Sequence, residues 1–428
     1  MAAPTGEFAS RRLHLRVAGL GRGLAPVARR LRRSPAARAQ LVAALAALLM
    51  AVPLLNSCSG MRTAPTPITG ASSAPVGGSA PANQVAPASA AAPSTAPSRS
   101  PVPLVAAPTD GVLESAAAAA RPVLAVMIDD APAARPQSGL ADADVLIQAP
   151  AEGGIPRYMA LYQTQAAPEI GPIRSSRRYF VGWAAAWRPL YAHVGGAPNA
   201  LAALQDMDGR LIWNADEFTW AAYMPRIATR IAPHNVYSST RQLDALAARL
   251  GTPAAPPAAW SFVDPAPLAA RPTGGSLVVP YPAGVISYTY DRASDRYLRS
   301  VDGSPEVDAG MGTRVAPYDV LVLFVAVGPL ANAPGQATNE EKGRLEVGYI
   351  GRGRALVLRD GAVIDAQWSK ASDAAPLLLT VADGPGAGAP ATLVRGQVAI
   401  QVVPEGTAIT LGPPASAAPT SRFGAPPD

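Results

Sequence analysis

The stretch Met127-Ile-Asp-Asp-Ala-Pro-Ala-Ala-Arg-Pro-Gln-Ser-Gly-Leu140 is the most informative part of this sequence, and Ala151-Glu-Gly-Gly-Ile-Pro-Arg157 extends it. Both polar loops follow an apolar run, residues 123–128, that is typical of a buried strand. Ligands are usually held by loops on a rigid scaffold. The sequence therefore predicts a functional site at the end of this strand, without identifying a reaction.

Strand and helix patterns alternate through the residues that follow. Strands are predicted at 144–148, 158–162 and 190–194, and helices at 176–187, 198–207 and 240–250, the last ended by Gly251. This alternation indicates an α/β domain with a mixed sheet. From Ser276 onward, short strands separated by Asp-Gly or Gly-rich turns predict a mostly antiparallel β domain, in which Asp360-Gly361 forms a hairpin turn.

The positive charge of the chain is concentrated at its start. Residues 1–57 hold nine arginines and one acidic residue, whereas the remainder has 27 basic and 29 acidic residues, a balance of −2. A nucleic-acid partner for the folded part is therefore not expected. The uncharged apolar run 41–55 is shorter than the roughly 20 residues of a membrane span. Together with the basic stretch before it, this run is typical of a secretory signal.

Cys58 follows this run in Leu55-Asn-Ser-Cys58, which resembles the bacterial lipobox. Acylation of Cys58 would anchor the protein to the outer face of the cytoplasmic membrane. The alternative is a signal that is not cleaved and is retained as the anchor. Because Cys58 is the only cysteine, an internal disulfide and a cysteine-based zinc site are excluded.

Composition divides the chain into six parts. Pro, Ala and Ser dominate the region after Cys58 and the C-terminal end, and neither region shows a hydrophobic period that could support a core. The predicted parts are a signal peptide (1–57), a disordered tether (58–118), an α/β domain (119–252), a Pro/Ala-rich linker (253–274), a β-rich domain (275–411) and a disordered tail (412–428).

Five ordered blocks carry a family resemblance. They are Asp129-Asp-Ala-Pro-Ala-Ala-Arg-Pro-Gln-Ser-Gly-Leu140, Glu152-Gly-Gly-Ile-Pro-Arg157, Gly171-Pro-Ile-Arg-Ser-Ser-Arg177, His193-Val-Gly-Gly196 and Ala232-Pro-His-Asn-Val-Tyr237. These blocks resemble the signature of the YerB-like bacterial lipoproteins, and Gly351-Arg-Gly-Arg-Ala355 and Gln401-Val-Val-Pro-Glu405 resemble that family's second domain. The chain departs from the family pattern at Asp130, where the family has Asn. The resemblance implies a two-domain extracytoplasmic lipoprotein and brings no established chemistry.

Arginines at the start of the predicted helix 176–187 suggest a site for a bound anion. A helix capped by Ser175 or Ser176 would place Arg177 in its first turn, where cations oppose the helix dipole. A bound anion, held by free N–H groups and guanidiniums, would explain this arrangement. Internal ion pairs with Glu152, Glu169 or other acidic residues explain it equally well. The turn at Gly195 and Gly196, before a helix opened by Pro198, is a second potential anion site.

Two histidines fall inside the blocks, His193 and His234. With Asp129, Asp130 or Glu152 they could bind a divalent ion, but no metal-ligand spacing is present, and structural hydrogen bonding is favoured for both. Neither a metal nor a cofactor is expected. Either histidine could act as a general acid or base. Ser138 lies outside any nucleophile motif and is interpreted as a turn residue.

These observations favour a binding protein over an enzyme. The leading hypothesis is that a cleft lined by Arg, His and Gly binds an anionic cell-envelope ligand, such as a wall polymer. The alternative is a hydrolase or transferase on envelope polymers, with His193, His234, Asp129 and Glu152 as catalytic candidates. A scaffold for other envelope proteins is a third class. The predicted ligand-binding residues are Asp129, Asp130, Arg135, Gln137, Ser138, Glu152, Arg157, Arg174, Ser175, Arg177, His193, Gly195, Gly196, His234 and Asn235.

Overall fold

The computed structural model describes residues 103–332 and 338–412. The predicted signal peptide, Cys58, the tether up to residue 102 and residues 413–428 of the predicted tail lie outside the described residues. Helical segments are α3 (Ala116–Ala119), η1 (Pro132–Ala134), η2 (Glu152–Gly154), α4 (Arg178–Ala184), η3 (Ala185–Trp187), α5 (Pro198–Met207), α6 (Glu217–Trp220), α7 (Thr240–Leu250), η4 (Leu268–Ala270) and α8 (Thr338–Glu341).

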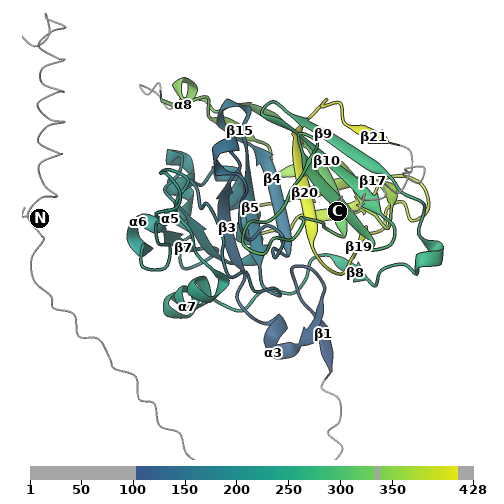
Figure 1. The fold of residues 1–428 in the computed structure, drawn as a ribbon, viewed down its shortest axis with the longest axis horizontal. Coiled ribbons are helices and arrows are strands. Elements are labelled where there is room, and N and C mark those ends of the chain that lie inside the picture. The colour runs from purple at the N-terminus through teal and green to yellow at the C-terminus, as the bar shows by residue number, and fades with distance from the viewer. Residues whose placement is uncertain (1–102, 333–337, 413–428) are drawn as a thin grey trace, which may run out of the picture. The chain divides into compact units, whose positions relative to one another are not determined.

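One large sheet runs through the described part of the chain (Figure 1). Its ten strands, in spatial order, are β18 (Leu378–Val381), β17 (Ala362–Lys370), β16 (Gly351–Arg359), β13 (Asp319–Val325), β20 (Val398–Pro404), β4 (Val145–Pro150), β5 (Pro156–Tyr162), β3 (Leu124–Asp129), β6 (Leu190–His193) and β7 (Trp213–Asp216). The parallel pairing of β20 with β4 joins strands from the two halves of the sequence. Both predicted domains therefore contribute to the same sheet.

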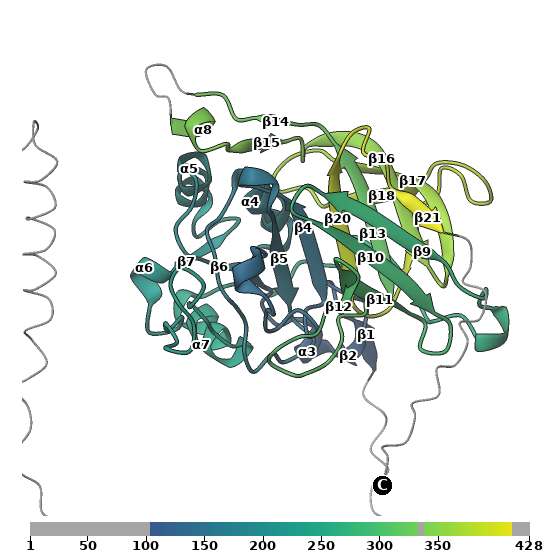
Figure 2. The same ribbon diagram turned by 45° about the horizontal axis from the view of Figure 1, so that its top comes forward.

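A second sheet packs on one end of the large one (Figure 2). Its strands are β12 (Ser304–Pro305), β11 (Arg296–Val301), β10 (Gly284–Asp291), β9 (Ser276–Tyr281) and β21 (Thr410–Gly412). Apolar side chains of β9 and β10 form a buried cluster with those of β13, β16 and β20. The smaller pairs are β1 (Leu104–Ala106) with β2 (Leu113–Ser115), β8 (Ser261–Val263) with β19 (Thr392–Val394), and β14 (Val327–Pro329) with β15 (Leu345–Val347).

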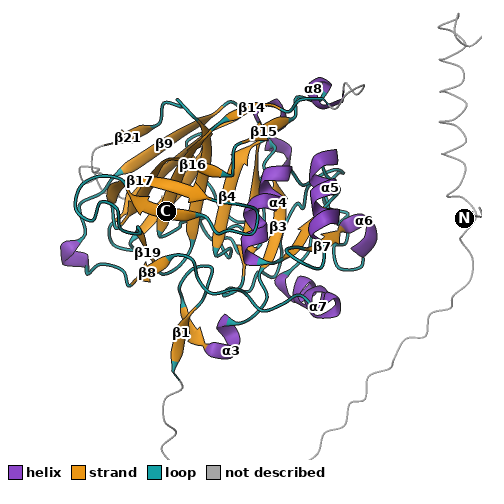
Figure 3. Ribbon diagram, turned by 180° about the vertical axis from the view of Figure 1, so that it is seen from behind, coloured by secondary structure: helices purple, strands orange, loops and turns teal. Residues whose placement is uncertain are grey.

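Helices α4, α5, α6 and α7 lie at the other end of the large sheet, as seen from behind in Figure 3. Strand β5 shows why this end is buried on both faces. Met159 and Leu161 belong to one core cluster, whereas Tyr158, Ala160 and Tyr162 belong to another on the opposite face. Since neighbouring strand residues point to opposite faces, a continuous apolar strand needs a cover on each side.

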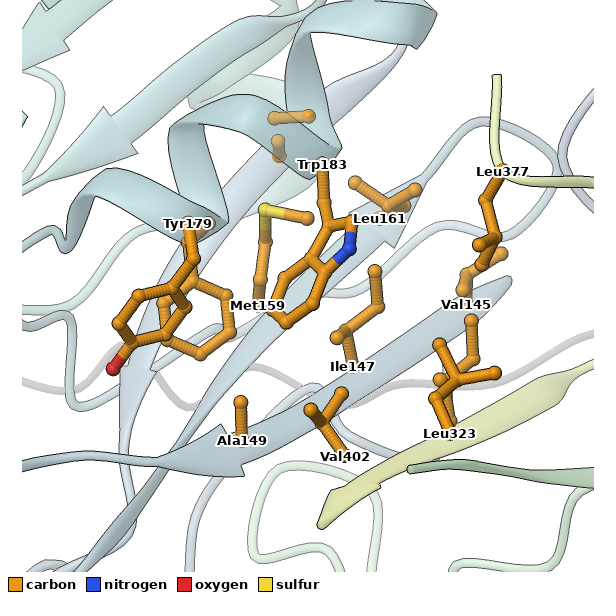
Figure 4. Close-up of a cluster of buried hydrophobic side chains, with 14 of the residues drawn as sticks. Val145, Ile147, Ala149, Met159, Leu161, Tyr179, Trp183, Leu323, Leu377 and Val402 are labelled. Atoms are coloured by element: carbon orange, nitrogen blue, oxygen red, sulfur yellow. The ribbon is translucent and has the colours of Figure 1, made fainter. Parts of the chain in front are cut away.

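Helix α4 covers one of these faces. Figure 4 shows its Tyr179 and Trp183 packed over Met159 of β5 and Ile147 of β4. Helix α7 contributes Leu243 and Leu246 to the core cluster on the opposite face. The end of β3, where the polar loops begin, is thus held within a packed scaffold.

The predicted fold class is confirmed, as a mixed sheet followed by mostly antiparallel strands. Helices α5 and α7 have the predicted bounds. Pro198 occupies the first turn of α5, and Gly251 ends α7 with a positive φ of 66°. The Asp360-Gly361 hairpin is confirmed as well, because Arg359 and Ala362 pair across it and both turn residues have positive φ.

Two segments differ from the expectation of unstructured chain. Residues 103–118, predicted as the end of the disordered tether, form β1, β2 and the start of α3, and Thr109 and Asp110 are buried. The predicted linker 253–274 is packed rather than free, since Trp260 is buried and its indole N–H donates to the Leu377 carbonyl across 2.8 Å. In both segments a few buried side chains fix a stretch whose Pro/Ala-rich composition is typical of loops.

Candidate functional site

Three segments meet at the end of β3. Asp129 pairs in register with Arg157 of β5. The segment leading to α4 runs alongside, because Arg174 N–H donates to the Met127 carbonyl across 2.8 Å and Ile128 bridges to Ile173. This backbone pairing places two arginines from different loops next to one aspartate.

One oxygen of the Asp129 carboxylate accepts hydrogen bonds from two side chains. Its Oδ2 accepts from Arg174 Nε across 2.9 Å and from His234 Nδ1 across 2.8 Å. Burial alone would raise the pKa of Asp129, but the guanidiniums of Arg157 and Arg174 hold this pKa below its usual value. Asp129 is therefore ionised at neutral pH and orients both partners.

The outer atoms of these two partners are open. The Arg174 and His234 side chains are 29% and 19% exposed. Within the described residues, neither the Nη atoms of Arg174 nor Nε2 of His234 has a hydrogen-bond partner. Arg174 thus presents hydrogen-bond donors to solvent from a fixed position. His234 presents Nε2, which accepts a hydrogen bond when the ring is neutral and donates one when the ring is protonated.

Arg157 lies deeper, and one of its donors is unsatisfied. Its Nη1 donates to the Ser175 carbonyl across 3.1 Å and to the Ser175 hydroxyl across 3.3 Å. Its Nε is buried without a hydrogen-bond partner among the described residues. Burial, with the neighbouring charge of Arg177, lowers the pKa of Arg157 to about 10, so the guanidinium still carries its charge at neutral pH.

The third arginine, Arg177, forms an ion pair with Glu152. Both oxygens of Glu152 accept from it, across 2.6 Å from Nε and 2.5 Å from Nη2. Burial would raise the pKa of Glu152, but the hydrogen bonds from Arg177 lower it. This pair matches the internal-ion-pair interpretation for Arg177. Arg178 likewise pairs with Asp373, across 2.9 Å.

The predicted serine cap of α4 is wrong. The N-cap residue is Arg177, without a side-chain cap hydrogen bond, and the helix begins at Arg178. The reason is that both serines have other partners. Ser175 accepts from Arg157 and Arg177, and the Ser176 hydroxyl lies 2.8 Å from the Tyr191 hydroxyl.

Asp130 serves a different group of residues. Its carboxylate accepts from Arg135 Nε across 3.0 Å, from the Gln137 amide across 3.1 Å and from the Gln148 amide across 2.6 Å. Gln148 in turn accepts from the fully buried Arg299 of β11 across 2.7 Å. The structure therefore separates Arg135 and Gln137 from the partners of Asp129.

His193 is enclosed. It is fully buried, with Nδ1 lying 2.8 Å from the Gly195 carbonyl and Nε2 lying 2.7 Å from the Asn214 amide oxygen. The Gly195 N–H belongs to the turn that the sequence predicts as an anion site. It already donates to the Asp216 carboxylate across 3.0 Å. Asp216 of the same chain thus occupies the place that an anionic ligand would take at this turn. We therefore assign His193 and the turn a structural role.

The loop that carries His234 is fastened to the loop after β3. Arg230 donates to the Ala134 carbonyl across 2.8 Å and to the Pro136 carbonyl across 2.6 Å. Asn235, a predicted ligand contact, accepts from Arg226 across 3.2 Å. Ser138, also predicted, is buried and donates to Glu169 across 2.6 Å. These contacts hold the loops in place, and they use groups that were predicted to contact a ligand.

Sequence reasoning missed several of these partners. Asn214 and Asp216 lie on β7, outside the signature blocks, and nothing in their local pattern marks them. Arg299 carried a usable signal, because it alternates with Tyr297 and Val301 along β11 and so belongs to the buried face of that strand. A charged residue at such a position predicts a buried network.

Comparisons with known proteins agree with this architecture. Two family models match, both described as protein of unknown function (DUF3048), the N-terminal domain at residues 109–252 and the C-terminal domain at residues 277–400. The chain belongs to this YerB-like family. A relative named "Putative lipoprotein YerB", from Bacillus subtilis (strain 168), is 28% identical over 318 residues, which is 70% of this chain and 86% of the relative.

The crystal structure of the YerB protein from Bacillus subtilis shows the same fold. It superimposes with a TM-score of 0.61 at 24% identity and covers 72% of this chain and 99% of that one. No helix within residues 103–332 or 338–412 has both the length and the apolar character needed to cross a membrane. The same residues contain no group of three or more His, Cys, Asp or Glu side chains arranged for a metal ion.

Proposed function

We propose that this YerB-like protein is anchored to the outer face of the cytoplasmic membrane through Cys58 and binds an anionic group of a cell-envelope ligand at the cluster around Asp129. The proposal is carried by two open, oriented groups, the Nη donors of Arg174 and Nε2 of His234. Nε2 donates to an anion when the ring is protonated and accepts from an O–H of the ligand when the ring is neutral. Both groups are positioned by a buried carboxylate, which is the arrangement that reduces the entropic cost of binding.

Charge counting supports the same conclusion. The cluster holds the guanidiniums of Arg157, Arg174 and Arg177 against the carboxylates of Asp129 and Glu152, which leaves one positive charge in excess. The unsatisfied Nε of Arg157 adds a buried donor. Buried polar groups are normally hydrogen-bonded, so an external oxygen would complete the cluster. A phosphodiester or carboxylate group brings the single negative charge that is needed.

The test is binding to purified bacterial wall material and its dependence on salt. Arg174→Ala should weaken binding by about tenfold or more and reduce the salt dependence. Arg354→Ala is the matched control, because Arg354 pairs with Asp365 at a site where both side chains are 60% exposed. Equal binding by the two variants would reject the proposal.

A second candidate function rests on the Asp129–His234 pair. An imidazole held at Nδ1 by a carboxylate, with Nε2 toward solvent, is oriented for general acid or base catalysis. A hydrolase of this kind would activate water, because the Ser175 hydroxyl oxygen already accepts hydrogen bonds from Arg157 and Arg177, which occupy its lone pairs. Hydrolysis of envelope polymers that disappears in His234→Gln would support it, and absence of hydrolysis by the wild type would exclude it.

A further inference from the structure

A cavity opens on the side of Asp130. Its volume is about 390 Å³, and it is formed by the loop at Arg135 and Gln137 together with the end of β11 and the segment after it, which contribute Asp302, Glu306 and Val307. The sequence assigned Arg135 and Gln137 to the same cleft as Arg174. The structure instead connects them to a different carboxylate and to this cavity.

Arg135 is fixed on its inner side and open on its outer side. Its Nε donates to Asp130, a carboxylate that is fully buried and that also accepts from Gln137 and Gln148. Within the described residues, the Nη atoms have no hydrogen bond. Asp302, which is largely exposed, lies 3.8 Å from Nη1. The cavity therefore contains a guanidinium whose orientation is set before any ligand arrives.

Two other charged groups line the cavity: Asp302, which is largely exposed, and Glu306, which is paired. Glu306 is buried, accepts from the Tyr158 hydroxyl across 3.2 Å and forms an ion pair with the fully buried Arg299. The Gln137 amide N–H₂ donates to the Asp129 carbonyl and to Asp130. Among the lining groups, Arg135 thus offers the cationic donor that remains available to a ligand.

The side chains that line the cavity indicate which group the ligand carries beside its anionic group. Pro136, Val301, Pro305 and Val307 give the cavity apolar sides. A planar carboxylate matches the outer edge of a guanidinium with two parallel hydrogen bonds. The apolar walls suit a hydrocarbon group attached to that carboxylate. Asp302 repels any anion at the cavity, and it repels a phosphate dianion more strongly than a monocarboxylate.

We propose that this cavity binds a monocarboxylate that carries a short apolar group, with Arg135 as the carboxylate-binding residue. The site is separate from the Asp129 cluster, and the proposal does not rest on the function assigned to that cluster. Small apolar acids, including the C-terminal residue of a peptide, have the required chemistry.

The test uses N-acetylvaline and its uncharged analogue N-acetylvalinamide in ligand-detected NMR with the full-length protein in detergent. The acid should bind at least about tenfold more tightly than the amide. Arg135→Leu should remove this preference, whereas Arg174→Leu should retain it. Equal binding of acid and amide by the wild type, or no binding of either at millimolar concentration, would overturn the proposal.

Loss of Arg135 also removes the cation that is hydrogen-bonded to buried Asp130, and the variant could misfold. A second variant therefore tests the cavity without this change. Val307→Glu places a negative charge at the cavity from a valine that is 41% exposed, and it leaves every contact of Asp130 in place. It should weaken binding of the acid by about tenfold. Val363→Glu, at a similarly exposed valine on β17, is the matched control. Equal binding of the acid by the two folded variants would contradict the proposal.

Discussion

Nδ1 of His234 donates to Oδ2 of Asp129 across 2.8 Å, and the same oxygen accepts from Arg174 Nε across 2.9 Å. One buried carboxylate thus fixes the positions of two side chains from separate loops. Removing its charge would disorder both partners and leave neighbouring Arg157 less compensated. The stability of the fold and the geometry of the site therefore depend on the same residue.

Asp129→Asn should lower the free energy of unfolding by about 3 kcal/mol or more, the effect of breaking a buried ion pair. Urea denaturation at pH 7 measures it. Because the pKa of Asp129 is lowered in the folded state, its stabilising contribution is complete above the ordinary value of 3.8 and is lost as the pH falls further. Asp365→Asn, at an exposed ion pair, should change stability by less than about 1 kcal/mol. Equal effects of the two substitutions would contradict this account.

Glu152→Gln should have opposite effects on stability and on binding. The substitution removes the acid that neutralises Arg177 and so destabilises the fold. It also raises the positive excess of the cluster by one charge, so an anionic ligand should bind more tightly. Isothermal titration with inorganic phosphate, alongside urea denaturation, measures both effects. Unchanged or weaker phosphate binding by a folded variant would show that Glu152 and Arg177 form a purely structural pair.

A pair of buried carboxyl groups should make stability depend on pH. The Thr164 hydroxyl lies 2.7 Å from Asp110 Oδ2 and 2.8 Å from Asp144 Oδ1, but it has one hydrogen to donate. A proton on one carboxyl group resolves this conflict. In agreement, burial and the charge of Asp110 raise the pKa of Asp144 to about 7.

Since the folded state binds this proton more tightly than the unfolded state, stability should fall as the pH rises from about 4 to 7. Asp144→Asn preserves the shape of the neutral carboxyl group and should remove the contribution of Asp144 to that fall. Urea denaturation from pH 4 to pH 8 tests this, with Asp365→Asn as the control that should follow the wild type. Parallel curves for Asp144→Asn and the wild type would exclude the shared proton.

The pairing of β4 with β20 should make the two halves of the described fold unfold together. Ile400 of β20 is fully buried and pairs with Ile147 of β4. Ile400→Ala should cost about 2–5 kcal/mol and leave a single unfolding transition. Val285→Ala, at a valine of β10 that is 41% exposed, should cost far less. Two separate transitions in Ile400→Ala would show that the halves are independent domains.

Local features of the fold could be predicted because local chemistry determines them. Pro198 fits the first turn of a helix, Gly251 accepts the left-handed backbone after one, and Asp360-Gly361 suits a two-residue hairpin. The pairing of β20 with β4 has no such signal, because the two strands are far apart in the sequence and both are largely apolar and almost wholly buried. Strand order among such strands is decided by packing rather than by pattern.

The candidate site was predicted in part. Its place at the end of β3, and the presence there of Asp129, Arg157, Arg174 and His234, follow from the loops that the sequence marks. The sequence does not show that the neighbours Asp129 and Asp130 bind different partners, because this depends on which side chains each carboxylate meets across the sheet. The same holds for His193, whose partner Asn214 comes from a strand that the sequence did not indicate.

The most direct test of the proposed anion site is a crystal of the protein soaked in inorganic phosphate. We expect one phosphate ion within hydrogen-bonding distance of the Nη atoms of Arg174 and of Nε2 of His234, and no phosphate ion there in crystals of Arg174→Ala. Phosphate bound only at other surfaces, with Arg174 and His234 unchanged and unoccupied, would contradict the proposal.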